Sequence, residues 1–482
     1  MRFILLAAVA ASLLGCATTP RTMNAERGFT PCADAGSHPA LAGSLCALTP
    51  APLTYDAADP GKDQAELFVR QFPAEGRRLG QVWLVAGGPG ESGAGFYALI
   101  DRLRSAFPGY DLLVPDHRGT GASSRVCPED ESEASAGGRE LAGAEWGTCF
   151  GLLESRAAWP QAFTITNAAH DLSRLIARHD GGGKTFLYGV SYGTQLVLRT
   201  MVVAPPARLD GIILDSLVPP EGDGQWDLSH RSQVVDAVGR QMLARCDADT
   251  ACRARLGGSA EAMMRAVVND PALAAQFPGE QPKLFFGSLL DSPDARALIP
   301  AVIAGVRAGD TVPLQAAQAR LEAQMAPFAA VGASSSIPLV AVISASENNA
   351  RPALTRADIA AEAADLLFTS SLPTQLAGGA GFAYPRDAAF GTSPSRLPPV
   401  LILQGDLDPK TPLAGARAHA DRFRAAGPVR FVTVEDAPHF ILLTAPDCAV
   451  REMQAFTRGA RAGEGACRAE QGADLGSAGS IR

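Results

Sequence analysis

Short apolar segments that alternate with helical segments constrain the fold of this chain more than any other feature. From Gln81 onwards, the apolar runs VWLVA, YDLLVP and KTFLYGV are each followed by a glycine-containing turn, and segments with apolar residues at helical spacing separate them. Strands that alternate with helices indicate a parallel sheet with helices on both faces. The sequence therefore predicts an α/β protein with a mostly parallel, doubly wound sheet.

The alternation stops after GIILDS (211–216) and resumes at PVLILQGDLD (399–408). The text between these two strands is mostly helical in pattern, rich in alanine, and broken by proline and glycine. Sheets of this kind bind ligands at the carboxyl edge of their strands, so we expect a large, mainly helical cap over that edge. The predicted organisation is a signal peptide (1–16), an N-terminal linker (17–45), a first core part (46–216), the cap (217–397) and a second core part (398–482).

A serine between two glycines follows one of the predicted strands directly. In FLYGVSYGTQ (186–195), Ser191 lies between the strand and the next helical segment. This is the strand–turn–helix context of a nucleophile elbow, and Gly189 and Gly193 keep bulk away from a strained, closely packed turn. A serine hydroxyl is a weak nucleophile that needs a base. We therefore expect Ser191 to be a nucleophile with partners elsewhere in the chain.

The base and the acid are expected in the order Ser, Asp or Glu, then His. Of the seven histidines, His439 lies late in the chain and just past a strand. LILQGDLDPKTP offers two aspartates: we favour Asp408, which lies deeper in the loop, and interpret Asp406 as a turn residue. Asp215 is a weaker candidate for the acid because it precedes the cap.

An oxyanion hole needs two backbone donors. We expect one from Tyr192, which follows the nucleophile, and one from the GGPG loop, at Gly88; a simple glycine–proline turn is the alternative for that loop. His117 and Arg118 in DHRG are expected to brace the site by hydrogen bonds rather than to touch the substrate.

Four motifs in order, GGPG, DHRGTGAS, GVSYGT and GDLDPKTP, resemble the proline iminopeptidase and tripeptidyl aminopeptidase branch of the α/β-hydrolases. The segment PDCAVREMQAFTRGARAGEGAC resembles the C-terminal segment of the secreted tripeptidyl aminopeptidase-like members. The resemblance implies an α/β-hydrolase fold with Ser191, Asp408 and His439 as the triad. Ala86 stands where proline iminopeptidases usually have a histidine, which argues against that narrower class.

The resemblance implies a serine hydrolase that removes short N-terminal units from peptides through an acyl-enzyme, with no metal and no organic cofactor. Aminopeptidases of this type hold the free amine of the substrate with cap carboxylates. Glu347 and Glu91 are the candidates here, and solvated surface acids are the alternative for each. A carboxylesterase or lipase on the same fold is the second hypothesis, and a catalytically silent binding lipoprotein is the third.

The first residues have the pattern of an export signal. Arg2 precedes the apolar run FILLAAVAASLLG, and LLGC resembles a bacterial lipobox ending at Cys16. The run is too short to favour a membrane-spanning helix. We expect an exported protein anchored through lipid on Cys16, facing the periplasm from the outer membrane because no aspartate follows the cysteine. An ordinary cleaved signal peptide, giving a soluble periplasmic or secreted protein, is the alternative.

The cysteine count also fits an oxidising compartment. Nine cysteines less Cys16 leave eight, for which 105 connectivities exist, and we favour pairing between sequence neighbours. A zinc site is disfavoured because C-x-x-C spacings and matching histidines are missing. A net charge of −8 without a basic run argues against nucleic acid, so the expected partners are peptide substrates, and a membrane only through the lipid anchor. The four expected pairs are Cys32 with Cys46, Cys127 with Cys149, Cys246 with Cys252, and Cys448 with Cys467.

Overall fold

The structure of the protein is a computed structural model that describes residues 24, 27–55, 64–156, 158–377, 382–460 and 462–469. Cys16 and the predicted signal peptide lie outside the described residues, and the expectations placed on them stay predictions.

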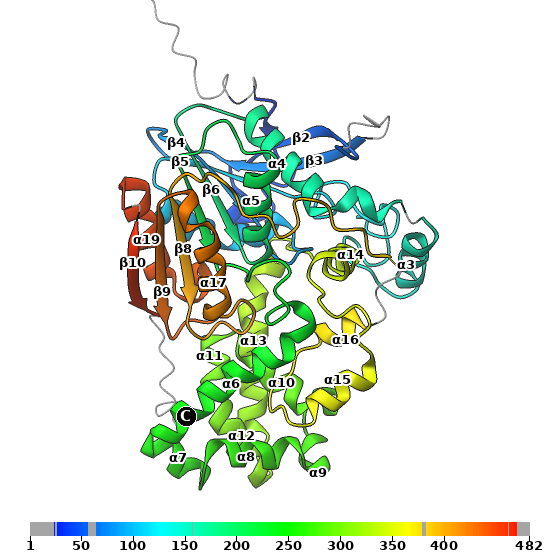
Figure 1. Ribbon diagram of the computed structural model, residues 1–482, viewed down its shortest axis with the longest axis vertical. Coiled ribbons are helices and arrows are strands. Elements are labelled where there is room, and N and C mark those ends of the chain that lie inside the picture. The colour runs from blue at the N-terminus through cyan, green and yellow to red at the C-terminus, as the bar shows by residue number, and fades with distance from the viewer. Residues whose placement is uncertain are drawn as a thin grey trace, which may run out of the picture.

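One sheet organises the described part of the chain (Figure 1). Its strand order is β1-β2-β3-β5-β4-β6-β7-β8-β9-β10. The pairs from β1 to β5 are antiparallel and all the others are parallel, so the predicted mostly parallel sheet is confirmed. The strands are β1 (Thr30–Pro31), β2 (Leu45–Pro52), β3 (Gln64–Phe72), β4 (Gly80–Val85), β5 (Tyr110–Pro115), β6 (Lys184–Val190), β7 (Gly211–Asp215), β8 (Val400–Gly405), β9 (Val429–Glu435) and β10 (Gly463–Arg468).

Both faces of the sheet are covered, as the continuous apolar runs require. In β4, Trp83 belongs to a core packed under α4, α5 and α17, whereas Leu84 belongs to the core on the opposite face, under α2, α18 and α19. Successive side chains of a strand point to opposite faces, so every residue of β4 is buried. The covering helices are α2 (Ile100–Ala106), α4 (Ile165–Arg178), α5 (Tyr192–Val203), α17 (Leu413–Phe423), α18 (Ile441–Thr444) and α19 (Pro446–Arg458), and α3 (Glu145–Ser155) lies before α4 in the chain.

Between β7 and β8 the chain forms a helical insertion with its own apolar core. In Figure 1 it lies below the sheet, in green to yellow, beyond the ends toward which the arrows of β8 and β9 point. Its helices are α6 (Arg231–Ala248), α7 (Thr250–Leu256), α8 (Ala260–Val268), α9 (Pro271–Ala274), α10 (Pro282–Leu289), α11 (Pro293–Arg296), α12 (Ile299–Ala308), α13 (Val312–Ala330), α14 (Ile337–Glu347), α15 (Arg356–Ala363) and α16 (Leu372–Leu376).

Ion pairs attach the insertion to loops at the carboxyl edge of the sheet. Arg245 of α6 pairs with Asp406 at 3.3 Å and also with Asp436. Arg296 of α11 donates a hydrogen bond to the backbone carbonyl of Asp436. Asp406 therefore serves as an anchor for the insertion, in addition to accepting the backbone N–H of Asp436 at 2.8 Å.

The N-terminal region differs from the sequence-based expectation. Residues 27–45, expected as part of a linker, pack on the core: Phe29 and Leu41 are buried, and Arg27 donates to the carbonyl of His179 at 2.7 Å. Strand β2 begins at Leu45, the last residue of the expected linker. Its two prolines are tolerated because most of β2 lies along an open edge, where a missing N–H breaks no ladder hydrogen bond.

Four disulfides join sequence neighbours, which confirms the expected pairing: Cys32–Cys46, Cys127–Cys149, Cys246–Cys252 and Cys448–Cys467. In the parts of the chain that the structure describes, no helix combines the length and the apolar character needed to cross a bilayer. Within the same residues, no three His, Cys, Asp or Glu side chains gather in a group suited to a metal ion.

We predict that the disulfides contribute to stability according to the loops they close. The partners are 22 residues apart in Cys127–Cys149 and 6 apart in Cys246–Cys252, which corresponds to about 3 and about 2 kcal/mol by loop entropy. Denaturant unfolding of the two paired cysteine-to-alanine variants measures this difference. An equal loss for both pairs would contradict the loop-length explanation.

Candidate active site

The backbone at Ser191 is strained. β6 ends at Val190 and α5 begins at Tyr192, and between them Ser191 has φ 55° and ψ −127°. A non-glycine residue in such a region costs about 1–3 kcal/mol unless its surroundings hold it. The Ser191 N–H donates to the carbonyl of Asp215 in the neighbouring strand at 3.0 Å, which ties the elbow to β7.

The glycines around Ser191 are required by close backbone contacts. A Cβ atom on Gly193 would lie 2.4 Å from the carbonyl oxygen of Val85 at the end of β4. A Cβ atom on Gly189 would lie 2.5 Å from the carbonyl oxygen of Gly193. The first turn of α5 can therefore approach β4 and β6 only without side chains at these two positions, which explains the G-x-S-x-G pattern.

Asp408 and His439 are in direct contact, as expected for an acid and a base. The Asp408 Oδ2 to His439 Nδ1 distance is 2.8 Å, and the side chain of Asp408 is fully buried. The backbone N–H groups of Lys410 and Thr411 donate to Asp408 Oδ1 at 2.8 Å each. Burial would raise the pKa of Asp408, but the adjacent His439 and the donors of Thr411 outweigh it and lower the pKa, so this carboxylate stays ionised.

Asp215 has a different role from the acid that we considered. Its buried carboxylate accepts hydrogen bonds from the Tyr188 hydroxyl at 2.8 Å and from the backbone N–H groups of Ile441 and Leu442 at 2.8 and 2.9 Å. These two residues follow His439 closely in the chain. Asp215 therefore fixes the loop that carries His439 rather than contacting its ring.

A pocket of about 80 Å³ is lined by four of the candidate residues, whereas Asp408, His439 and Glu91 are not among its lining residues. Ser191, Tyr192 and Gly88 line it from the core, and Gly88 has φ 110°, which favours glycine. Thr411 lines the same pocket and its hydroxyl lies 3.3 Å from His439 Nδ1. The Asp408–His439 pair is thereby connected to the space in front of Ser191.

Glu347 lines this pocket from the end of α14. Its carboxylate accepts a hydrogen bond from Arg199 at 2.6 Å and one from the Tyr384 hydroxyl at 2.7 Å. The same Arg199 nitrogen lies 2.8 Å from each carboxylate oxygen of Glu221, another pocket residue. Burial raises the pKa of Glu347, the charge of Arg199 opposes it, and the charge of Glu221 adds to it. Two carboxylates thus share one guanidinium.

The remaining candidates lie around the pocket. Glu91 is exposed, and its carboxylate lies beside Gly87 at the base of the GGPG loop. The His117 ring packs against Tyr192 with centroids 5.5 Å apart, and burial lowers its pKa to about 4. Arg118 is buried in a bidentate pair with Asp171 at 2.6 and 2.8 Å. Neither His117 nor Arg118 is placed to act as the base for Ser191.

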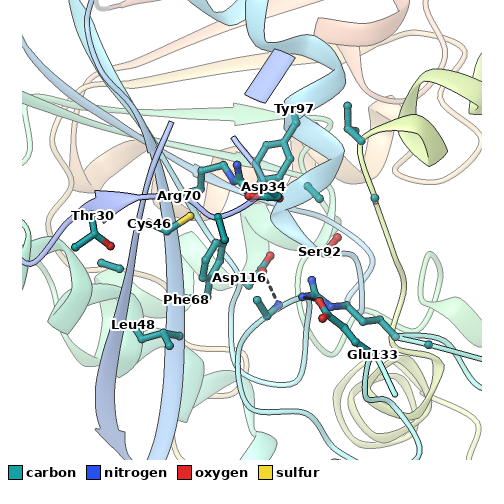
Figure 2. Close-up of a pocket in the computed structure, with 18 of the residues that line it drawn as sticks. Thr30, Asp34, Cys46, Leu48, Phe68, Arg70, Ser92, Tyr97, Asp116 and Glu133 are labelled. Carbon is teal, nitrogen blue, oxygen red and sulfur yellow. Dashed lines mark hydrogen bonds and ion pairs between the residues drawn. The ribbon is translucent and has the colours of Figure 1, made fainter. Parts of the chain in front are cut away.

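A larger cavity, of about 880 Å³, lies elsewhere, between β2, β3 and the segment 92–97. Figure 2 shows Arg70, Asp34 and Tyr97 gathered at one side of it. Arg70 bonds both carboxylate oxygens of Asp34, at 2.6 and 2.7 Å, and its guanidinium carbon lies 4.8 Å from the centre of the Tyr97 ring. Among the described residues that line it, none belongs to the Ser191 elbow or the Asp408 loop, so the smaller pocket is the candidate active site.

Several residues of the site escaped the sequence analysis. Thr411 lies inside the quoted GDLDPKTP motif, and Glu221 follows shortly after a predicted strand, where a site residue is common. Arg199 lies eight positions after Ser191 on α5, and Arg231 begins α6. No local pattern distinguishes these two arginines from surface residues, because their partners come from distant parts of the chain.

Comparisons with known proteins agree with this geometry. A model of the alpha/beta hydrolase fold matches residues 82–255, and a model described as TAP-like protein matches residues 377–465. Serine protease Hip1 of Mycobacterium tuberculosis is 29% identical over 246 residues, which are 45% of this chain and 46% of that protein. Tripeptidyl aminopeptidase of Streptomyces lividans is 28% identical over 218 residues, 40% of this chain and 39% of that protein.

Among solved structures, a thermophilic esterase from Thermogutta terrifontis aligns with 86% of this chain and 99% of its own, at 16% identity and a TM-score of 0.36. That likeness is too remote to bear on function. The chain has the α/β-hydrolase fold. Its C-terminal part is similar to TAP-like proteins, and parts of the chain are similar to a serine protease and a tripeptidyl aminopeptidase. The chain covers less than half the length of either curated relative.

We predict that Gly193→Ala destabilises the protein by about 3 kcal/mol, because the added methyl would overlap backbone that cannot move freely. Gly151→Ala in the middle of α3 is the matched control, since an added Cβ there meets nothing within 4 Å. It is expected to be neutral or slightly stabilising. Thermal unfolding of both variants measures the difference, and equal stability would refute the close-approach explanation.

Proposed function

We propose that this protein is an exported serine peptidase that removes short N-terminal units from peptides, with Ser191 as the nucleophile. One observation carries the proposal: the strained serine opens into a pocket that also contains a buried carboxylate pair and the hydroxyl in contact with His439. A peptide substrate that places its cleaved bond at Ser191 would therefore place its N-terminal amine near those carboxylates. The peptidase names of the two relatives support the choice of a peptide over an ester.

In the proposed reaction, His439 takes the proton of Ser191 as the serine oxygen attacks the substrate carbonyl carbon. Asp408 holds the imidazole by its bond to Nδ1 and stabilises the cation that forms. Four hydrogen-bond donors around Asp408, from Gln404, Lys410 and Thr411, keep the carboxylate in place. The nitrogen of the leaving amine then takes the proton from His439, and water releases the acyl group.

The oxyanion of the tetrahedral intermediate is proposed to lie between the backbone N–H groups of Gly88 and Tyr192. Both residues line the pocket beside Ser191. Tyr192 is the first residue of α5, so its N–H belongs to the unpaired N-terminal turn of the helix. His117 packs under Tyr192 and is proposed to support this arrangement. Removing one such donor typically costs about 10²–10³ in rate.

The free amine of the substrate is proposed to bind at Glu347, together with Glu221. Two carboxylates beside the single guanidinium of Arg199 leave one uncompensated negative charge at the pocket wall. An ammonium group would compensate that charge. Glu91 is exposed on the loop, which makes it the weaker choice for this role.

We also propose that the chain is exported and tethered by lipid on Cys16 to the outer membrane, facing the periplasm. The disulfides support the oxidising compartment, and the sequence around Cys16 supports the lipid anchor. A soluble periplasmic or secreted protein is the alternative.

We predict that Ser191→Ala abolishes hydrolysis and that Asp408→Asn lowers kcat by about 10⁴-fold. Asp406→Asn is the matched control, because Asp406 faces Arg245 of the insertion instead of His439. The assay uses aminoacyl, prolyl and tripeptidyl anilides together with short acyl esters. Activity that survives in Ser191→Ala would rule out the nucleophile, and turnover of esters without anilides would identify an esterase.

We predict that Glu347→Gln raises KM for peptides with a free amine by about 10–100-fold, the value of a hydrogen bond to a charged group. N-acetylated peptides should be affected much less, because they carry no ammonium charge. Glu75→Gln serves as the control, because Glu75 is an exposed carboxylate that is not among the residues lining the pocket. Equal KM changes for free and blocked peptides would mean that Glu347 supports the fold of the pocket and does not bind the amine.

A further inference from the structure

Arg231 is a buried charge without a partner. It is the first residue of α6, it is 7% exposed, and it lines the pocket in front of Ser191. Its Nε is buried and has no hydrogen-bond partner, and no hydrogen bond or ion pair found among the described residues joins its guanidinium. Arg199, which lies behind the lining carboxylates, is in contrast paired with Glu221 and Glu347.

The carboxylates whose charges act on Arg231 bond other groups, although Oδ1 of Asp291 has no hydrogen-bond partner. The charges of Asp408, Asp291 and Asp227 act on Arg231, while burial lowers its pKa. Asp408 is bonded to His439 and Thr411, Asp291 pairs with Lys410 at 3.2 Å, and Asp227 bonds Ser229 and His230. The guanidinium therefore keeps unused donors at the pocket.

Burial removes part of the hydration of the Arg231 guanidinium, and its Nε has no hydrogen bond to replace it. An anion in the pocket would offset that loss of hydration. A guanidinium carries five N–H donors in a planar fork that matches a carboxylate, and such pairs are frequently bidentate. The chemistry of the vacant donors thus points to a carboxylate.

The pocket lining carries charges of both signs. Glu347 and Glu221 line it beside α5, whereas Arg231 and Lys410 line it near the loop that carries Asp408, together with the carboxylate of Asp227. His439 contacts that same loop, and in the proposed reaction it hands a proton to the leaving amine. Arg231 therefore belongs to the side on which the leaving fragment departs.

We propose that Arg231 binds a carboxylate of the leaving fragment, so that the enzyme prefers short peptides whose C-terminal carboxylate, or an acidic side chain next to the cleaved bond, reaches this side of the pocket. This inference rests on the proposed peptidase function.

Turnover gives the first test. The wild-type enzyme is assayed on two matched pairs of peptides. The first pair is trialanine and trialanine amide. The second pair is two peptide amides that differ only in having Glu or Gln directly after the cleaved bond. We expect kcat/KM to be 10–100-fold higher for the carboxylate member of one matched pair, as for a charge-assisted hydrogen bond. Arg231→Met should reduce this ratio toward one, and Arg231→Lys should restore part of it, since it keeps a positive charge.

Arg240→Met is the matched control on the same helix. Arg240 pairs with Asp236 and Glu261 instead of lining the pocket, so its loss should leave the acid-to-amide ratio unchanged. A preference for trialanine over its amide supports a site for the C-terminal carboxylate. A preference for the glutamyl peptide over the glutaminyl peptide supports a site for an acidic side chain. Equal kcat/KM for both matched pairs in wild type overturns the inference.

Binding separates this inference from the function on which it rests. The inactive Ser191→Ala protein is titrated calorimetrically with trialanine and with trialanine amide, with Arg231 intact or replaced by Met. Tighter binding of the acid that requires Arg231 supports the site even if no peptide is hydrolysed, in which case only the peptidase proposal fails. Hydrolysis of peptides with equal binding of acid and amide leaves the peptidase standing and removes the carboxylate site.

Discussion

The contact between the first turn of α5 and the end of β4 is the constraint on which the site depends. The backbone of Gly193 lies so close to the carbonyl of Val85 that no side chain fits between them. This approach holds the helix against the sheet and leaves Ser191 in its unfavourable conformation. The Ser191 N–H is simultaneously held by β7. The strain is localised at the one residue whose side chain must project from the sheet, because its neighbours on both sides are fixed.

Around this point, the two halves of the core are joined by polar contacts that pass beneath the pocket. Asp215 at the end of β7 receives the backbone N–H groups that follow His439, and Ser216 receives the N–H of Phe440 at 2.8 Å. The strand next to the elbow thus also sets the position of the histidine loop. The helical insertion adds charged groups of both signs to the pocket lining, among them Glu347 and Arg231.

The core and the residues of the elbow were predictable because their determinants are local. An apolar strand, two glycines and a helix identify Ser191, and a loop after a strand identifies Asp408 and His439. Fold class, family and disulfide pairing followed from the same kind of pattern. The N-terminal segment was misjudged as a linker because its polar, glycine-rich composition hid the burial of Phe29 and Leu41. The roles of Arg199 and Arg231 could not be predicted from the sequence, because most of the residues that surround them are distant in the chain.

The disulfides bear on how such a chain reaches its fold. The two cysteines of each bond are separated by at most 22 residues, and Cys246–Cys252 lies wholly inside the insertion. A chain delivered N-terminus first to an oxidising compartment would present both members of one pair before the next pair arrives. Correct oxidation then requires no long-range pairing and little reshuffling. Since none of the disulfides among the described residues links the insertion to the core, an evolving lineage can replace the insertion, and with it the pocket wall, without disturbing the oxidation of the rest.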